Sequence, residues 1–349
     1  MNIVSASSAF PKHYYPQQAL AERFRAHWGA KLENPQILDW LHQKVAVDGR
    51  YLAYPAESYE NLRDFGEAND LWIDAAMDLG ERAIHCALKR AGVSVQDVGA
   101  LYFVSITGIA SPSIDARLIN RMGFSPGLRR VPVFGLGCVA GAAGISLAAD
   151  YVRAHPKRIA VLLAVELCSL TIQREDLSMA NLISAALFGD GAAAVVVAGA
   201  DRGLTGPRIV ATRSVFYPET EDVMGWDISA KGFRIVLSAG VPEMVTKHLA
   251  GDVDAFLTEN GLTRGEIGSW IIHTGGPRVL EAVQDSLDLP EGALGASWDS
   301  LRRTGNLSSA SVLCVLEKFM MERRPKPGTW SVLSAMGPGF CSELVLLQW

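Results

Sequence analysis

Residues 91–104 read AGVSVQDVGALYFV, and residues 260–273 read NGLTRGEIGSWIIH. The two segments align without a gap at a constant offset of 169 residues. Five positions keep the same residue or the same chemical type: Gly92 with Gly261, Ser94 with Thr263, Asp97 with Glu266, Val98 with Ile267, and Gly99 with Gly268. Each segment ends in an apolar run that is typical of a buried strand. The repeat predicts two related α/β halves.

The same offset brings three reactive side chains to matching ends of predicted elements. Gly137-Cys138, before a helix of small residues, falls on Asn306-Leu307, before a second run of small residues. His273 falls beside Val104, at the end of the equivalent strand. The sequence therefore predicts that a thiol, a carboxamide and an imidazole lie where the two halves face one another.

Three continuous apolar runs, 98–107, 159–166 and 192–197, predict strands covered on both faces. Predicted helices and further strands alternate with them along the chain. The helices are 72–90, 114–122, 139–153, 242–259, 277–287 and 309–322, and the further strands are 330–335 and 344–347. Alternation alone also permits a Rossmann-like sheet. The repeat favours two thiolase-like halves, 1–203 and 204–349, that stack as an αβαβα layered core.

Composition excludes several classes of protein. The 349 residues are 49% hydrophobic and 20% charged, with a net charge of −5, which argues against a nucleic-acid surface. Five cysteines form no CxxC pair, so we expect neither a disulfide framework nor a zinc cluster, and a reducing cytoplasm fits best. The N-terminus lacks a signal-peptide pattern, and the apolar runs are too short for a transmembrane segment.

Cys138 is the candidate nucleophile. It follows the predicted strand RVPVFGLG and precedes the small-residue helix VAGAAGISLAADY. The free N–H groups and the dipole at a helix N-terminus favour a thiolate. A buried structural cysteine is the alternative, and that interpretation is kept for Cys168 and Cys314.

His273 and Asn306 are the candidate partners of the thiol. His273 ends an apolar strand and enters a glycine turn, where side chains of α/β enzymes face a site. A backbone-capped histidine and a helix N-cap asparagine are the structural alternatives. As a set, Cys, His and Asn predict a thiolate that attacks, with an imidazolium and an amide that bind an oxyanion.

Five phrases, in order along the whole chain, resemble the type III polyketide synthases, the chalcone and stilbene synthase family. They are GLGCVAGAAG (135–144), LFGDGAAAVVV (187–197), IIHTGGPRVL (271–280), TGNLSSAS (304–311) and AMGPGF (335–340). The phrases FGLGCVAGAAG, VELCSLT and NLSSAS look most like bacterial synthases that make alkylpyrones or alkylresorcinols from fatty acyl-CoA.

The resemblance implies iterative decarboxylative Claisen condensation of malonyl-CoA onto an acyl-CoA starter, without a metal or redox cofactor. Cys138 matches the residue that carries the acyl chain. His273 and Asn306 match the residues that bind the malonyl thioester and stabilise the enolate. The resemblance also implies a homodimer.

Further positions match the walls of the family's pocket. Phe188 matches one of two gatekeeper phenylalanines, and the second falls on Ile235, whose lost aromatic ring predicts a wider portal. Ser111, Thr107 and Cys168 are small where an acyl tunnel would run, so we expect medium or long fatty acyl starters, each buried methylene contributing roughly 0.8 kcal/mol. The resemblance assigns the remaining substrate contacts to Thr171, Lys44, Gly337, Pro338 and Gly339.

Three alternatives stay open. A β-ketoacyl synthase III-like enzyme uses the same residue types, but His273 is followed here by Thr-Gly-Gly-Pro rather than leading into Gln-Ala-Asn. A cysteine hydrolase would admit water to the acyl enzyme and release free acid. An inactive scaffold would not need the three reactive residues.

Overall fold

A single nine-stranded sheet runs through the computed structural model, which describes all residues from 1 to 349. The two halves meet where β1 pairs with β8 at Asn2 and Arg208. Within the first half, β4 runs parallel to its neighbours β5 and β6. β7 runs antiparallel to both of its neighbours, β6 and β1. In sheet order the strands are β11 (Ile267–Ile272), β12 (Trp330–Gly337), β13 (Cys341–Gln348), β8 (Arg208–Phe216), β1 (Asn2–Ala9), β7 (Asp190–Ala198), β6 (Ile159–Leu167), β4 (Val98–Val104) and β5 (Arg129–Val133).

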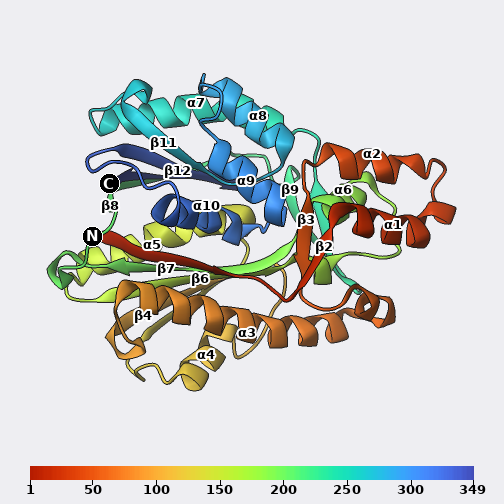
Figure 1. The fold of residues 1–349 in the computed structure, drawn as a ribbon, viewed down its shortest axis with the longest axis horizontal. Helices are drawn as coiled ribbons and strands as arrows, with labels where there is room; N and C mark the ends of the chain where they lie inside the picture. Colours follow the sequence, from red (N-terminus) through yellow and green to blue (C-terminus); the bar gives the residue numbers. More distant parts are fainter.

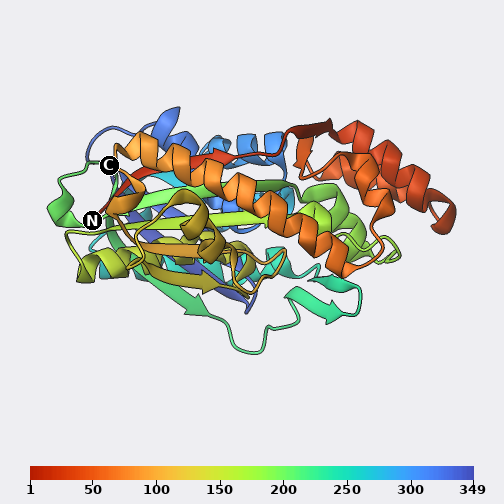
Figure 2. The same ribbon diagram turned by 90° about the horizontal axis from the view of Figure 1, so that it is seen from below.

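Helices form three layers around this folded sheet (Figure 1). Two helices, α5 (Ala140–Ala154) and α10 (Ser309–Met321), lie between the halves. The outer faces are covered by α3 (Phe65–Ala91) and α4 (Ile114–Met122) on one side, and by α7 (Val241–Glu259) and α8 (Pro277–Ser286) on the other. Figure 2 shows α3 lying lengthwise across the strands of the first half. This αβαβα stack confirms the predicted thiolase-like fold.

The repeat seen in the sequence is a repeat of structure. Gly92 follows α3 and Gly261 follows α7, with φ of 68° and 69°, a left-handed conformation that favours glycine. The next residues, Ser94–Asp97 and Thr263–Glu266, each form a capping box on a short 3₁₀ turn. The turns lead into β4 and β11. The shared residues therefore encode the same helix–turn–strand unit in both halves.

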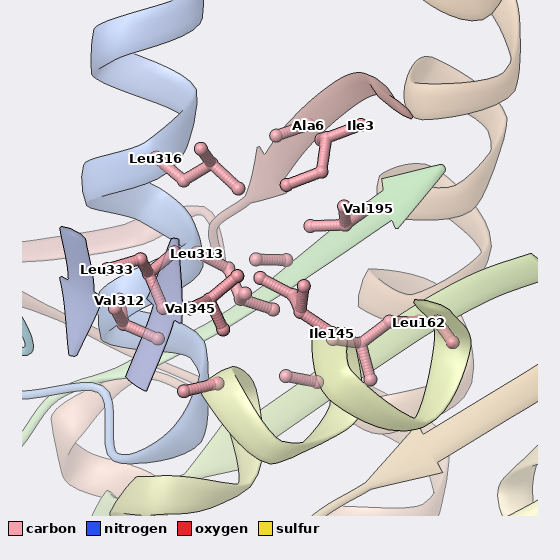
Figure 3. Packing of buried hydrophobic residues seen from close by; sticks show 14 of the residues in the cluster. Ile3, Ala6, Ile145, Leu162, Val195, Val312, Leu313, Leu316, Leu333 and Val345 are labelled. Atoms are coloured by element: carbon pink, nitrogen blue, oxygen red, sulfur yellow. The ribbon is translucent and has the colours of Figure 1, made fainter. Parts of the chain in front are cut away.

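The central layer is packed closely because its helices carry small residues. A side chain at Gly141 would lie 2.2 Å from the carbonyl oxygen of Ser309 on α10, and one at Gly144 would lie 2.4 Å from Leu162 on β6. Aliphatic side chains from both halves of the sheet and from both helices fill the space between the halves (Figure 3). The central core thereby fixes where α5 and α10 begin, which is where Cys138 and Asn306 lie.

Several elements that the sequence patterns did not predict gather at one end of the layers, on the right of Figure 1. They are α1 (Gln17–Trp28), α2 (Gln36–Lys44), α6 (Met179–Leu187), β2 (His13–Pro16), β3 (Gly49–Leu52), β9 (Met224–Ser229) and β10 (Gly232–Leu237). A further helix that was not predicted, α9 (Gly295–Thr304), lies in the middle of the molecule and packs against α10. None of the helices is long and apolar enough to cross a membrane.

Candidate active site

Cys138 lies in the 3₁₀ turn Gly137–Val139 that leads into α5, and it is only 5% exposed. The predicted loop Gly337–Gly339 packs on this turn. A side chain at Gly137 would lie 2.8 Å from the ring of Pro338, and one at Gly337 would lie 2.7 Å from the backbone nitrogen of Val139. The Gly-Pro-Gly loop therefore forms a wall beside the thiol.

Asn306 is fixed at both its backbone and its side chain. Its backbone pairs with Phe188: the N–H donates to the carbonyl of Leu187 at 3.0 Å, and its carbonyl accepts from Gly189 at 2.9 Å. The side-chain Oδ1 accepts from the Ser308 backbone N–H at 2.8 Å and from the Ser311 hydroxyl at 3.4 Å. The amide Nδ2 is left with one long contact, 3.4 Å to the carbonyl of Gly275. Asn306 can therefore donate to a ligand.

Ser308 joins Cys138 to Asn306, and the sequence analysis did not single it out. The Cys138 thiol donates to the Ser308 hydroxyl over 3.6 Å. Ser308 has φ of 47° and ψ of −127°, a backbone conformation that costs a residue with a side chain on the order of 1–3 kcal/mol. In the sequence, its place two residues after Asn306 in the TGNLSSAS phrase could have marked Ser308 as a site residue.

His273 follows β11 directly and is 5% exposed. Its backbone N–H donates to the carbonyl of Ser334 at 3.0 Å, and its carbonyl accepts from Gly275, which also contacts Asn306. The ring nitrogen Nδ1 is buried and has no partner. Burial lowers the pKa of His273 to about 4, so the imidazole is neutral at pH 7.

Burial acts against the thiolate and the imidazolium that the sequence predicted. Burial, followed by the charge of Glu166, raises the pKa of Cys138 to about 12, although the bond to Ser308 acts in the opposite direction. Burial therefore favours the neutral form of both the thiol and the imidazole. The helix N-terminus was visible in the sequence, but the burial that outweighs it was not.

Glu166 is a fully buried carboxylate next to the site. Its Oε2 accepts from the Ile106 backbone N–H at 3.1 Å and from the Thr107 hydroxyl at 2.9 Å. Its Oε1 accepts from the hydroxyl and backbone N–H of Ser309, the first residue of α10. A carboxylate inside the apolar run 159–167 was a usable sequence signal. Thr107, predicted as a small residue in the tunnel wall, is buried and bonded into this network.

The structure separates the other predicted pocket residues. Cys168 is buried, and burial together with the nearby charges of Glu166 and Asp190 raises the pKa of its thiol well above the usual range. Ser111 is exposed, in the loop after β4. Lys44 is exposed at the end of α2. These exposed positions do not test whether Ser111 and Lys44 bind substrate, so both roles stay predictions.

A cavity of about 1140 Å³ does not include the three candidate catalytic residues in its lining. It lies between α1, the start of α3 and the β9–β10 hairpin, and Thr171 is the one predicted contact that lines it. Phe233, from the hairpin, forms part of the wall. All three candidate catalytic residues are buried.

Aromatic rings occupy the hairpin at the predicted wide portal. Ile235 is half-buried and pairs across β9 and β10 with Trp226. The Trp226 indole N–H donates to the carbonyl of Ile106 at 2.9 Å, and its ring packs 5.7 Å from the ring of Phe233. The ring missing at Ile235 is thus matched by Trp226 on the neighbouring strand. No pattern in the sequence pointed to this tryptophan.

A buried thiol, imidazole and carboxamide at matching element ends of a duplicated thiolase-like fold define an acyl-transferring condensing enzyme. Comparison with known families gives the particular family. Residues 2–202 match "Chalcone and stilbene synthases, N-terminal domain", and residues 208–349 match the C-terminal domain of the same family. The chain belongs to this family, the type III polyketide synthases, which are acyltransferases.

Two similar proteins from Streptomyces carry the same name. The 1,3,6,8-tetrahydroxynaphthalene synthase of Streptomyces peucetius subsp. caesius is 52% identical over 100% of this chain and 93% of its own. The crystal structure of the synthase of the same name from Streptomyces coelicolor A3(2) superposes with a TM-score of 0.94 at 33% identity, covering 100% and 99% of the two chains. A putative chalcone synthase of Bacillus subtilis is 34% identical over 99% of this chain and 98% of its own. The predicted closer likeness to alkylpyrone synthases is not supported.

Proposed function

We propose that this polyketide synthase uses malonyl-CoA as starter and extender and releases a product of the 1,3,6,8-tetrahydroxynaphthalene type. The support is the 52% identical relative of that name. Carbon balance agrees with malonyl-CoA alone: five malonyl groups that each lose one carbon dioxide supply the ten ring carbons. The alternating oxygen positions of 1,3,6,8-tetrahydroxynaphthalene fit a chain of two-carbon units.

The observation that carries the proposal is Trp226. Its indole is anchored to the carbonyl of Ile106, whose own N–H binds Glu166 beside the thiol. We propose that the ring, fixed by this hydrogen bond, takes up volume that a fatty acyl chain would need. A malonyl group is short and does not need that volume. The ring therefore favours a small starter over a long one.

For loading, we propose that neutral His273 accepts the proton of the Cys138 thiol as sulfur attacks the thioester carbonyl of malonyl-CoA. The carbon–sulfur bond to CoA breaks, a bond to Cys138 forms, and CoA leaves as the thiol after protonation. A neutral imidazole with a pKa lowered to about 4 is in the form that can accept this proton. The Cys138 thiol, with its pKa raised to about 12, needs such a base.

For extension, we propose that His273 and the Asn306 amide Nδ2 hold the thioester carbonyl of a second malonyl-CoA. Carbon dioxide leaves, and the electron pair of the broken carbon–carbon bond forms the enolate that these donors stabilise. The enolate carbon attacks the acyl carbonyl on Cys138, and the bond between that carbonyl and the sulfur breaks. The Cys138 sulfur leaves as a thiolate and takes up a proton. Preorganised donors of this kind contribute on the order of 3–4 kcal/mol each to the transition state.

Two variants test the starter assignment. Trp226→Gly removes the ring, and Trp226→Phe keeps most of its bulk while losing the hydrogen bond to Ile106. With malonyl-CoA and a C4–C12 acyl-CoA series, we expect wild type and Trp226→Phe to give mainly malonyl-only product. Trp226→Gly should incorporate the longer starters. Alkylpyrones or alkylresorcinols from the wild type would instead support the fatty acyl starter predicted from the sequence, and a single condensation would indicate a β-ketoacyl synthase III-like enzyme.

We also propose that the enzyme is a homodimer. Ser111 lies in an exposed loop, and the apolar side chains of Ile109 and Phe134 are 48% and 53% exposed. We expect this loop and these apolar side chains to lie at the interface with the second copy.

A further inference from the structure

Helix α6 ends at Leu187, and the next residue, Phe188, pairs with Asn306. A helix leaves its last four carbonyl groups without partners in the helix. Here the carbonyl of Leu187 accepts from the Asn306 backbone N–H. The carbonyl of Ala186 accepts from the Gln17 side chain at 2.7 Å. The carbonyls of Ala185 and Phe188 both accept from Arg50, each at 2.6 Å.

Arg50, on β3, is buried to 1% exposure, which is rare for a cation. Its Nη1 donates to the two α6 carbonyls, and its Nε donates to the Gln17 Oε1 at 3.1 Å. Burial lowers the pKa of Arg50 to about 10, and the charge of Asp190 opposes that shift. A cation at a helix C-terminus is also favoured by the helix dipole.

The stem of Arg50 packs against the backbone on each side of the active-site bridge. A side chain at Gly305 would lie 3.1 Å from the Arg50 Cδ and 2.5 Å from the Leu187 carbonyl oxygen. A side chain at Gly189 would lie 3.5 Å from the Arg50 Cβ. The residue before Asn306 and the residue after Phe188 are therefore both held against Arg50.

We infer that Arg50 is a positioning residue, which fixes the Phe188–Asn306 bridge and through it the direction of the Asn306 carboxamide. The inference rests on the enolate-binding role proposed for Asn306. Arginine suits the task because its planar fork reaches the α6 carbonyls and Gln17 at once, whereas lysine presents a single ammonium. Arg50 itself need not touch a substrate.

The role predicts which step fails. Moving the carboxamide weakens enolate stabilisation but leaves the Cys138 turn, on the far side of Ser308, in place. In Arg50→Met we expect the kcat of malonyl-CoA decarboxylation to fall at least tenfold, with KM changed less than threefold. Acylation of Cys138 by malonyl-CoA, measured by intact mass, should stay within threefold of wild type. The kcat of decarboxylation in Arg50→Lys should lie between the values of Arg50→Met and the wild type.

Control variants separate positioning from stability. Arg130→Met breaks an ion pair with the buried Asp115, at the edge strand β5, and should lower the melting temperature without changing the ratio of decarboxylation to acylation. If Arg50→Met does not fold, Gln17→Ala carries the test, and its ratio should fall at least threefold. An unchanged ratio in folded Arg50→Met, or in Gln17→Ala, overturns the inference.

Asn306→Ala serves as the reference for the proposed function. If Asn306→Ala keeps decarboxylation, the enolate-binding role is wrong. If Asn306→Ala loses decarboxylation while Arg50→Met keeps it, only the positioning role of Arg50 is wrong.

Discussion

Replacing Glu166 with glutamine perturbs the buried network beside the nucleophile without changing its shape. The carboxylate accepts from five donors, among them the backbone N–H groups of Ile106 and Ser309. A glutamine offers one oxygen and one NH₂ group. Hydroxyl donors can rotate and accept from the NH₂ group, but a backbone N–H cannot. One of the two backbone donors is therefore left unsatisfied in either orientation of the amide.

An unsatisfied buried N–H costs about 1–3 kcal/mol, and the remaining bonds weaken when the acceptor loses its charge. Burial raises the pKa of Glu166 because it disfavours the charged form, so removing the charge recovers part of the lost stability. We expect a net destabilisation of about 2–3 kcal/mol, or roughly 3–4 °C in Tm for a chain of this length. The charge of Glu166 also raises the pKa of Cys138, so Glu166→Gln should make the thiol more acidic.

Urea unfolding and the rate of Cys138 alkylation measure the two effects. Glu343→Gln is the matched control, because this largely buried carboxylate accepts only from the hydroxyls of Ser146 and Ser214. It should lose less than about 1 kcal/mol. Wild-type stability in Glu166→Gln, or an equal loss in both variants, would refute the argument from backbone donors.

Three further predictions concern the triad and assembly. Iodoacetamide should alkylate Cys138 about tenfold faster per pH unit from pH 7 to 10, because the raised pKa keeps the thiol protonated; a plateau below pH 8 would indicate a stable thiolate. Cys138→Ala should form neither acyl adduct nor product, and intact mass that finds the adduct on Cys168 of the wild type would contradict this assignment. Light scattering at micromolar concentration should give the mass of a dimer, and a fully active monomer would exclude that role for the Ser111 loop.

The sequence predicted the layered core well because that information is local and repeated. The range 114–122 coincides with α4, and the runs 98–107 and 159–166 contain or nearly match β4 and β6. The three reactive residues were found because each follows a strand or precedes a helix of small residues. Features of this kind depend on neighbours in the chain, so one sequence displays them.

The parts that were missed depend on contacts between distant segments. The pKa of Cys138 is raised chiefly by its burial, which no local pattern reveals. Arg50 and Phe188 are 138 positions apart but share a hydrogen bond. Trp226 lies on a short strand without clear periodicity, so its bond to Ile106 could not be predicted.

The most direct test is to supply the enzyme with malonyl-CoA as the only thioester and identify the product by mass. We predict an aromatic product of the tetrahydroxynaphthalene type, with one carbon dioxide and one CoA released for every malonyl-CoA consumed. Cys138→Ala should give none. If the wild type makes no product until an acyl-CoA is added, and then makes alkylpyrones or alkylresorcinols, malonyl-CoA is not the starter and the proposed function is wrong.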